Sequence, residues 1–175
     1  MTSPNHQSGT DRCAEVAAQL DAEIIINVQG DEPFIEIQPI KDLIELFRHD
    51  QEVEIATLAC QLHDKEIIND RNTVKLVKSL SDKALYFSRS VIPSKIPSIH
   101  FKHIGVYAFR REILIRLAEL PPSILELAES LEQLRWIENN FDIHIVMAEQ
   151  DGLSIDTEED LRHAELIIKQ RSVFK

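Results

Sequence analysis

The sequence predicts an α/β fold with a mainly parallel sheet, helices on both faces and a small antiparallel excursion. Apolar stretches of strand length alternate with stretches of helical periodicity, which is typical of such folds. Residues 24–28 are mostly β-branched and favour a strand buried on both faces of a parallel sheet. The chain has 175 residues, 43% of them hydrophobic and 28% charged, so we expect residues 1–175 to form one domain.

Capping residues and apolar stripes predict the helices. Thr10 or Asp11 can cap the first, Pro39 suits the first turn of the second, and Ser123 with Glu126 forms a capping box. Pairs of apolar residues three and four apart supply one buried face in each segment. The helices are expected at 11–20, 39–49, 110–120, 124–139 and 156–170.

Alternating or continuous apolar runs predict the strands. They are expected at 24–28, 54–62, 72–78, 85–89, 101–109 and 142–149. Less helix separates the strands between residues 72 and 109, so we place the antiparallel excursion there. Residues 91–100 carry two prolines and no periodicity, and they are expected to form a loop.

Composition excludes several classes of function. A net charge of −11 argues against general nucleic-acid binding, which needs a basic face. No apolar run approaches the ~20 residues needed to cross a bilayer, so no membrane contact is expected. Two distant cysteines, Cys13 and Cys60, fit a reducing cytoplasm better than a disulfide scaffold. With four glycines, the chain contains no glycine-rich phosphate loop.

Polar residues follow the strand 24–28 directly. Gln29, Asp31 and Glu32 stand between the strand-ending residues Gly30 and Pro33. Ligands of open α/β sheets bind at the carboxyl ends of strands, and a carboxylate there can hold Mg²⁺ beside a phosphorylated ligand. An ordinary polar turn after a core strand explains the same residues.

Two further segments suggest ligand contacts, each with a plainer explanation. Ser8-Gly9-Thr10 precedes a helix and could receive a base or phosphate, or could simply cap that helix. On the strand 101–109, His103, Gly105 and Tyr107 share one face, which suits a pocket wall, although a lone strand histidine is usually only partly exposed. His100 and His103 point to opposite faces, which argues against a metal site between them.

Other candidates have structural explanations of their own. Arg89 places a cation at a strand end. Glu132, Gln133 and Arg135 lie on a predicted helix, where a solvated face is the default. Asp156 forms an N-terminal capping arrangement with Glu159, so a catalytic role for it needs independent support.

Six fragments occur in order with sensible spacing: HQSGTDR, INVQGDEP, YFSRS-x-IP, KHIGVYAFRR, SLEQLRW and SIDTEEDL. Together they closely resemble the 3-deoxy-manno-octulosonate (Kdo) cytidylyltransferase family over nearly the whole chain. The resemblance implies a Rossmann-type fold like that of the nucleotide-diphospho-sugar transferases. It also implies transfer of CMP from CTP to Kdo, with release of pyrophosphate, for lipopolysaccharide synthesis.

The resemblance assigns roles by motif. It implies that Asp31 and Asp156 are the catalytic carboxylates that hold Mg²⁺. It places Ser8, Gly9, Thr10 and Arg12 around the nucleotide. The sugar would be bound by Gln29, Arg89, His103, Tyr107, Glu132 and Gln133. A sugar acid needs a cation for its carboxylate, which Arg89 can supply.

The sequence departs from the family pattern at its start. Family members begin with a strand and a basic loop of the type PAR-x-x-S-x-R-LPGKP, and nothing here matches it. We therefore expect the first βα unit or units to be missing, the strand 24–28 to lack a neighbour, and this chain alone to be weakly active or inactive. The family's dimer contact uses residues near 93–101, a region that is short here, so a homodimer remains an expectation. The alternatives are a cytidylyltransferase for another acidic sugar, such as a neuraminate, and a non-catalytic sugar-binding remnant.

Overall fold

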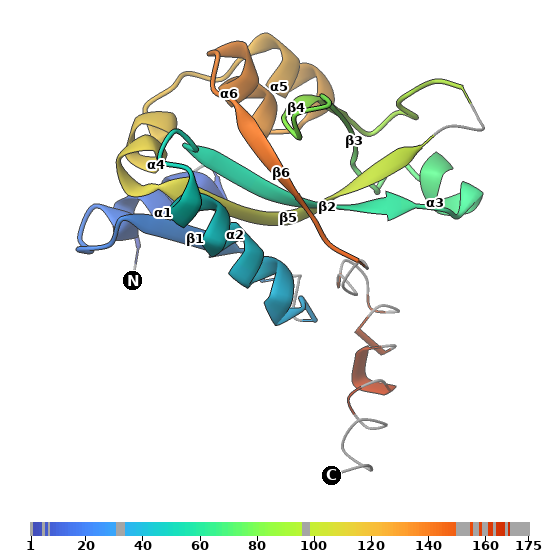
Figure 1. Cartoon of the computed structure of the whole chain (residues 1–175), viewed down its shortest axis with the longest axis horizontal. Coiled ribbons are helices and arrows are strands. Elements are labelled where there is room, and N and C mark those ends of the chain that lie inside the picture. Colours follow the sequence, from blue (N-terminus) through green and yellow to red (C-terminus); the bar gives the residue numbers. More distant parts are fainter. Residues whose placement is uncertain are drawn as a thin grey trace.

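The computed structural model describes residues 2–4, 6, 8–30, 34–95, 99–149, 155, 158, 161, 162, 164–166 and 168. In these residues a six-stranded sheet lies between helices on both faces, as the sequence predicts (Figure 1). The strands are β1 (Ile24–Val28), β2 (Ile55–Leu62), β3 (Lys75–Lys78), β4 (Ala84–Ser88), β5 (His100–Arg110) and β6 (Ile143–Met147). The helices are α1 (Gly9–Ala17), α2 (Ile37–His49), α3 (Lys65–Asn69), α4 (Arg111–Ala118), α5 (Ile124–Glu129) and α6 (Gln133–Glu138).

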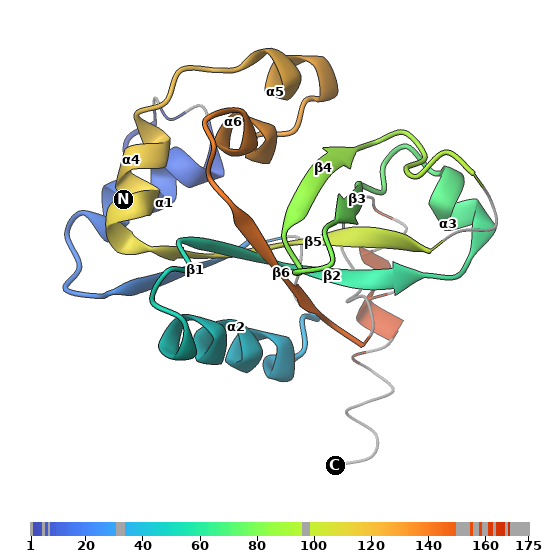
Figure 2. The same cartoon turned by 45° about the horizontal axis from the view of Figure 1, so that its top comes forward.

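Strand β5 is the centre of the sheet. On one edge it pairs antiparallel with β2, with a bulge at residues 105–106. The opposite edge pairs with β3 near Phe101 and with β1 from Val106 to Arg110. The carboxyl end of β1 and the start of β3 therefore meet the same edge of β5, on either side of residues 103–105 (Figure 2).

The prediction of a mainly parallel sheet is wrong for the pairing of the strands. Among the described strands only β2 and β6 pair in parallel. Strands β1, β2, β3 and β6 nevertheless run in one direction, because the first three are all antiparallel to β5 and β6 is parallel to β2. Alternation of helices and strands thus predicts the direction of these strands, but not the insertion of β5 between β1 and β2.

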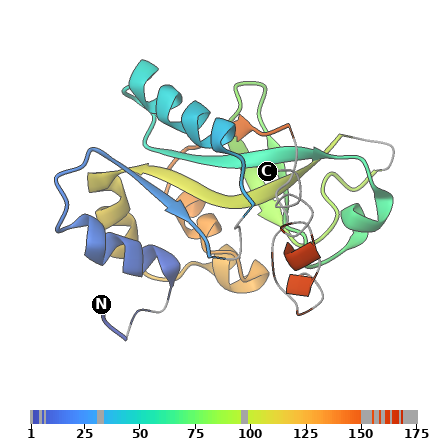
Figure 3. The same ribbon diagram turned by 90° about the horizontal axis from the view of Figure 1, so that it is seen from below.

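Two apolar cores lie on the two faces of the sheet. One is packed under α1, α4 and α6 and contains Tyr107, Phe109 and Trp136. The other is packed under α2 and contains Phe47, Leu58 and Ile104. Figure 3 shows the sheet between α2 on one side and α1 with α4 on the other. Tyr107 and Ile104 belong to different cores because alternate residues of β5 face opposite sides, as predicted.

Two helix predictions need correction. The predicted helix 124–139 is two helices, because Ser130 adopts a left-handed conformation with φ of 56° and ends α5. As a result Leu127 is exposed, whereas Leu131 and Leu134 are buried. The short helix α3 was not predicted at all; Asp64 caps it by accepting a hydrogen bond from the Glu66 N–H (2.7 Å). No helix in the described part of the chain is long and apolar enough to span a bilayer.

Strand β1 is not buried on both faces, contrary to the prediction. All five of its residues are partly or largely exposed, and Val28 retains 41% of its accessible surface. Within the described residues β1 pairs with β5 alone, so its other edge offers unpaired backbone groups. An apolar strand with a free edge is a template for association with another chain.

Substituting Val28 with lysine should therefore slow aggregation. A charged side chain on a free edge opposes strand-to-strand pairing. We expect Val28→Lys to reduce light scattering during slow heating, with little change in the unfolding midpoint. The control is Leu80→Lys, which places the same charge on an exposed apolar residue in the β3–β4 turn. Equal scattering by Val28→Lys and the unsubstituted chain would show that the β1 edge does not drive association.

Candidate active site

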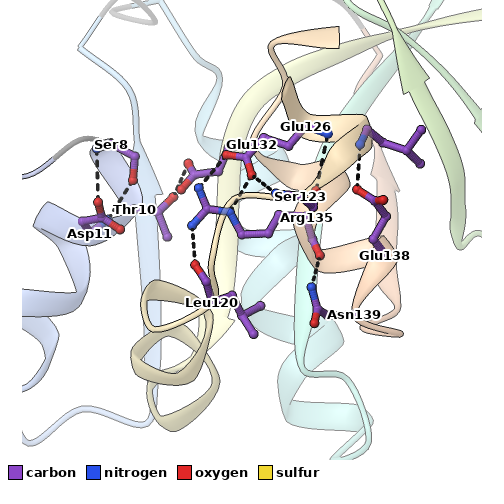
Figure 4. Close-up of polar contacts among 11 residues, drawn as sticks. Ser8, Thr10, Asp11, Leu120, Ser123, Glu126, Glu132, Arg135, Glu138 and Asn139 are labelled. Atoms are coloured by element: carbon purple, nitrogen blue, oxygen red, sulfur yellow. Dashed lines mark hydrogen bonds and ion pairs between the residues drawn. The ribbon is translucent and has the colours of Figure 1, made fainter. Parts of the chain in front are cut away.

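The amino end of α1 reaches the α5–α6 turn across the face of the sheet. The buried Thr10 hydroxyl donates to Oε2 of Glu132 at 2.7 Å (Figure 4). Ser8 caps α1: its Oγ accepts from the Asp11 N–H at 3.1 Å, and its own N–H donates to the Asp11 carboxylate. The cap is thus Ser8, and the predicted Thr10 or Asp11 cap is wrong. Thr10 instead joins two segments that are 122 positions apart in the sequence.

Arg12 does not join this group. Its side chain is exposed, and its Nη1 donates to the Thr2 hydroxyl at 2.7 Å and the Ser3 carbonyl at 3.3 Å. Gly9 is exposed, and a side chain there would meet nothing within 4 Å. Of the four residues predicted to surround the nucleotide, Thr10 lies against Glu132, while Arg12 is held beside the N-terminal segment.

The break between α5 and α6 places Glu132 and Gln133 at the start of α6. Gln133 is buried and Glu132 is partly buried, so the solvated helix face taken as the default is wrong for both. Burial raises the pKa of Glu132, while hydrogen bonds from Thr10 and Ser8 oppose the shift. The negative charge of Glu132 also helps to raise the pKa values of Cys13 and Tyr107, after burial, so all three groups share one environment.

An ion pair holds the broken helix in shape. The Arg135 guanidinium binds Glu126 through two bonds, Nε to Oε2 at 2.7 Å and Nη2 to Oε1 at 2.5 Å (Figure 4). Its Nη1 donates to the Leu120 carbonyl at 2.9 Å. Glu126 also completes the predicted capping box by accepting from the Ser123 N–H. Arg135 is buried rather than solvated, and it ties α6 to the start of α5 and to the chain after α4.

The β5 face carries the predicted pocket residues. Gln29 leaves the end of β1 and lies against Gly105, where an added Cβ would be 3.2 Å from Gln29 Oε1. A side chain at position 105 would therefore displace Gln29. The rings of His103 and Tyr107 are 5.2 Å apart between centroids, so these two side chains share one face of β5, as the strand alternation predicts.

His103 is a neutral hydrogen-bonding group near pH 7. Burial, and to a lesser degree the Lys102 cation, lower the pKa of its imidazole to about 3. Its Nε2 is 3.0 Å from the Thr57 hydroxyl, whose own proton is directed to the Val106 carbonyl at 2.7 Å. Nε2 must therefore carry the proton and donate to Thr57, which leaves Nδ1 as an acceptor.

The Tyr107 hydroxyl is buried and makes no hydrogen bond of acceptable geometry among the described residues, although the nearby Thr57 hydroxyl acts to lower its pKa against the larger effects of burial and Glu132. Burial raises the pKa of this phenol well above its usual value, so it stays protonated. A buried, unpaired hydroxyl is costly, and such a group in a native structure calls for an explanation. A ligand oxygen is one explanation that suits a pocket wall.

Arg89 follows β4, two residues after Phe87, whose ring contacts His103. Phe87 and His103 meet edge to face, with centroids 5.2 Å apart. The Arg89 Nη1 donates to the carbonyls of Arg71 and Asn72 at 3.3 and 3.4 Å. Arg89 is partly exposed, so its guanidinium remains accessible to an anion.

The predicted metal carboxylates, Asp31 and Asp156, lie outside the described residues. Within the described part of the chain no group of three or more histidine, cysteine, aspartate or glutamate residues could hold a metal ion. Carboxylate oxygens are ligands that Mg²⁺ prefers, and Asp31 follows Gly30 directly after the end of β1. The chemistry of this donor pair suits Mg²⁺, and the site stays a prediction.

Sequence analysis missed several polar residues that support the site. Thr57 orients His103 from within an apolar strand, and Asn27 lies opposite Tyr107 in the β1–β5 register. Lys75 and Glu129 contact the chain around Arg89. One of these residues could have been found from the sequence. Lys75 stands between Val74 and Leu76 in a predicted strand, and a charged residue at such a position indicates a buried polar contact.

Comparisons with known proteins agree with the motifs. A family model described as cytidylyltransferase matches residues 1–145. A 3-deoxy-manno-octulosonate cytidylyltransferase of Flavobacterium johnsoniae is 42% identical over 175 residues, covering 97% of this chain and 72% of that protein. One from Fusobacterium nucleatum is also 42% identical, covering 99% of this chain and 72% of its own length.

Solved structures agree as well. CMP:2-keto-3-deoxy-manno-octonic acid synthetase complexed with CTP matches with a TM-score of 0.92 at 38% identity, covering 98% of this chain and 72% of that one. At 16% identity and a TM-score of 0.57, 4-diphosphocytidyl-2C-methyl-D-erythritol synthase from Anaerococcus prevotii shares the fold. The predicted nucleotide-diphospho-sugar-transferase-like fold and the family resemblance are confirmed.

The first prediction from this site is that His103 does not titrate near neutral pH. Its imidazole proton signals should stay constant from pH 8 to pH 5, because burial keeps the pKa at about 3. NMR of histidine-labelled protein measures this, with the exposed His49 ring as a reference in the same molecule. A midpoint near 6.5, the value of an unperturbed histidine, would contradict the burial argument.

The second prediction concerns the Glu126–Arg135 pair. Arg135 lowers the pKa of Glu126 below its ordinary 4.5. The pair therefore stabilises the fold above that pH, and its contribution is lost as pH falls through the folded pKa. Glu126→Gln should cost about 3 kcal/mol of unfolding free energy at pH 7, since it leaves a buried guanidinium uncompensated.

Denaturant unfolding between pH 7 and pH 3 tests this expectation. The difference between Glu126→Gln and the unsubstituted chain should shrink towards zero at the acid end. Glu45→Gln, which breaks an exposed pair with Arg48, is the control and should change stability by less than about 0.5 kcal/mol. A difference for Glu126→Gln that does not depend on pH would exclude the ion pair as its source.

Proposed function

Because the chain belongs to the 3-deoxy-manno-octulosonate cytidylyltransferase family, we propose that it transfers CMP from CTP to Kdo, for lipopolysaccharide synthesis. The observation that carries the proposal is the contact of Thr10 with Glu132. It joins the α1 segment assigned to the nucleotide to the α6 segment assigned to the sugar, over the β5 face that holds His103 and Tyr107.

The reaction is an in-line displacement at phosphorus. The anomeric hydroxyl of Kdo attacks the α-phosphorus of CTP and loses its proton. The new bond joins the sugar oxygen to phosphorus, and the bond to the bridging oxygen breaks, so that pyrophosphate leaves with the electron pair. Transfers of this kind need little covalent help from a protein and much positioning and charge stabilisation.

The proposed sugar site combines one cation, for the sugar carboxylate, with several groups that can form hydrogen bonds to the sugar hydroxyls. His103 is neutral near pH 7, so Arg89 is the proposed partner of the sugar carboxylate. We assign hydroxyl contacts to the acceptor Nδ1 of His103, the unpaired Tyr107 hydroxyl, the Gln29 amide and the Glu132–Gln133 turn. The geometry that supports this is the packing of Gln29 on Gly105 and of His103 on Tyr107.

The nucleotide and the metal complete the proposed site. Ser8, Gly9 and Thr10 lie at the amino end of α1, where the helix dipole favours phosphate, and Arg12 follows in the first turns of the same helix. Asp31 and Asp156 are the proposed Mg²⁺ ligands. When bound, the ion would neutralise charge on the phosphates.

Removing the Tyr107 hydroxyl tests the sugar site. We expect Tyr107→Phe to keep or raise the unfolding temperature, because the hydroxyl is buried without a partner. We expect its Kd for Kdo to rise by about two- to tenfold, the value of one neutral hydrogen bond. Calorimetric titration with Kdo, and with N-acetylneuraminate as a competitor of similar chemistry, measures both affinity and sugar choice.

The only other tyrosine provides the control for stability. Tyr86 donates to Glu129 at 3.4 Å, so Tyr86→Phe should lower the unfolding temperature instead. Unchanged Kdo affinity in Tyr107→Phe would remove this residue from the sugar site. Tighter binding of N-acetylneuraminate than of Kdo would replace the proposed substrate with a neuraminate.

A further inference from the structure

Lys75 is a fully buried charge in the middle of the sheet. It lies on β3 opposite Ser88 of β4 and Lys102 of β5, and it has no exposed surface. Its ammonium donates three hydrogen bonds, to the carbonyls of Asp70 (2.7 Å), Thr73 (2.6 Å) and Arg89 (2.6 Å). All three N–H groups are thus satisfied, which a buried ammonium requires.

These contacts join Arg89 to the loop 70–73. The two outer carbonyls of that loop, at Asp70 and Thr73, accept from Lys75. The two inner carbonyls, at Arg71 and Asn72, accept from Nη1 of Arg89. Four consecutive carbonyls are therefore divided between two cations, and Lys75 also binds the carbonyl of Arg89 itself.

Glu129 holds Arg89 from the other side. Its Oε2 accepts from the Arg89 N–H at 3.4 Å and from the buried Ser88 hydroxyl at 2.9 Å. The backbone of Arg89 is thus fixed at its N–H by a carboxylate and at its carbonyl by an ammonium. Glu129 ends α5, three residues before Glu132, so the same turn is bound to both halves of the proposed sugar site.

The guanidinium that results has a defined orientation. Among the described residues its bonds to the loop involve Nη1 alone. Nε and Nη2 are left, and a pair of guanidinium nitrogens can bind a carboxylate through two parallel bonds. Burial lowers the pKa of Lys75, the Asp70 carboxylate opposes that shift, and the Arg89 and Arg71 cations add to it, so the Lys75 and Arg89 charges lie close enough to interact.

We propose that Lys75 and Glu129 are positioning residues that aim the Arg89 guanidinium at the carboxylate of the sugar acid. The inference rests on the proposed function, because it needs Arg89 to bind that carboxylate. Lys75 acts through the loop and the Arg89 carbonyl, and Glu129 acts through the Arg89 N–H. Neither residue needs to touch the sugar.

Comparing Kdo with its C1 methyl ester tests the proposal, since the ester keeps the hydroxyls and lacks the charge. The unsubstituted chain should bind Kdo more tightly than the ester. Lys75→Met should reduce this preference by about tenfold, while affinity for the ester changes by less than about threefold. A role confined to folding would weaken both ligands equally. Lys78→Met, on the same strand and paired with Asp82, is the control.

Glu129→Met removes both the acceptor for the Arg89 N–H and the negative charge, and it provides a second test if Lys75→Met does not fold. If only the negative charge of Glu129 mattered, its loss would raise the preference for Kdo over the ester. Loss of positioning would lower it, and a decrease of about threefold is expected.

Arg89→Met separates a failure of the positioning role from a failure of the proposed contact between Arg89 and the sugar carboxylate. If Arg89→Met keeps the preference for Kdo over the ester, the assignment of Arg89 under the proposed function is wrong. If Arg89→Met loses the preference but folded Lys75→Met and Glu129→Met keep it, the positioning role is overturned.

Discussion

The ion pair of the buried Arg135 with the partly buried Glu126 is the interaction on which the geometry of the site depends. The pair joins α6 to the start of α5. The bond from Arg135 to the Leu120 carbonyl also joins α6 to the chain after α4. With these helices joined, Glu132 meets Thr10 of α1, and Glu129 meets the end of β4. A buried ion pair contributes little net stability compared with apolar packing, so its main value here is in specifying one arrangement of the two short helices.

The second constraint is the shared edge of β5. Because β1 and β3 pair with different parts of one edge, residues 103–105 lie between the two strands. The absence of a side chain at Gly105 lets Gln29 lie against the sheet there. His103 keeps one nitrogen for Thr57 and presents the other as an acceptor. The positions of His103 and Tyr107 are thus set by the pairing of β5 with its neighbours.

The sequence was sufficient for local features and insufficient for contacts between distant segments. Alternation along residues 101–109 correctly predicted that His103, Gly105 and Tyr107 share a face, because strand geometry alone decides this. It could not predict that β5 enters between β1 and β2, since pairing depends on residues far away in the chain. The burial of Lys75 was equally hidden, because its partners at Asp70, Thr73 and Arg89 belong to the turn before β3 and the end of β4. For Asp31 and Asp156 the motifs remain the whole argument.

The left-handed residue Ser130 has a consequence for two acidic side chains. In an unbroken helix, Glu129 and Glu132 would be neighbours on one face, where like charges repel each other. The turn at Ser130 sends one carboxylate to Ser88 and the other to Thr10. A single irregular residue thereby replaces a repulsive pair on one helix face with two separate contacts, one to the end of β4 and one to the start of α1.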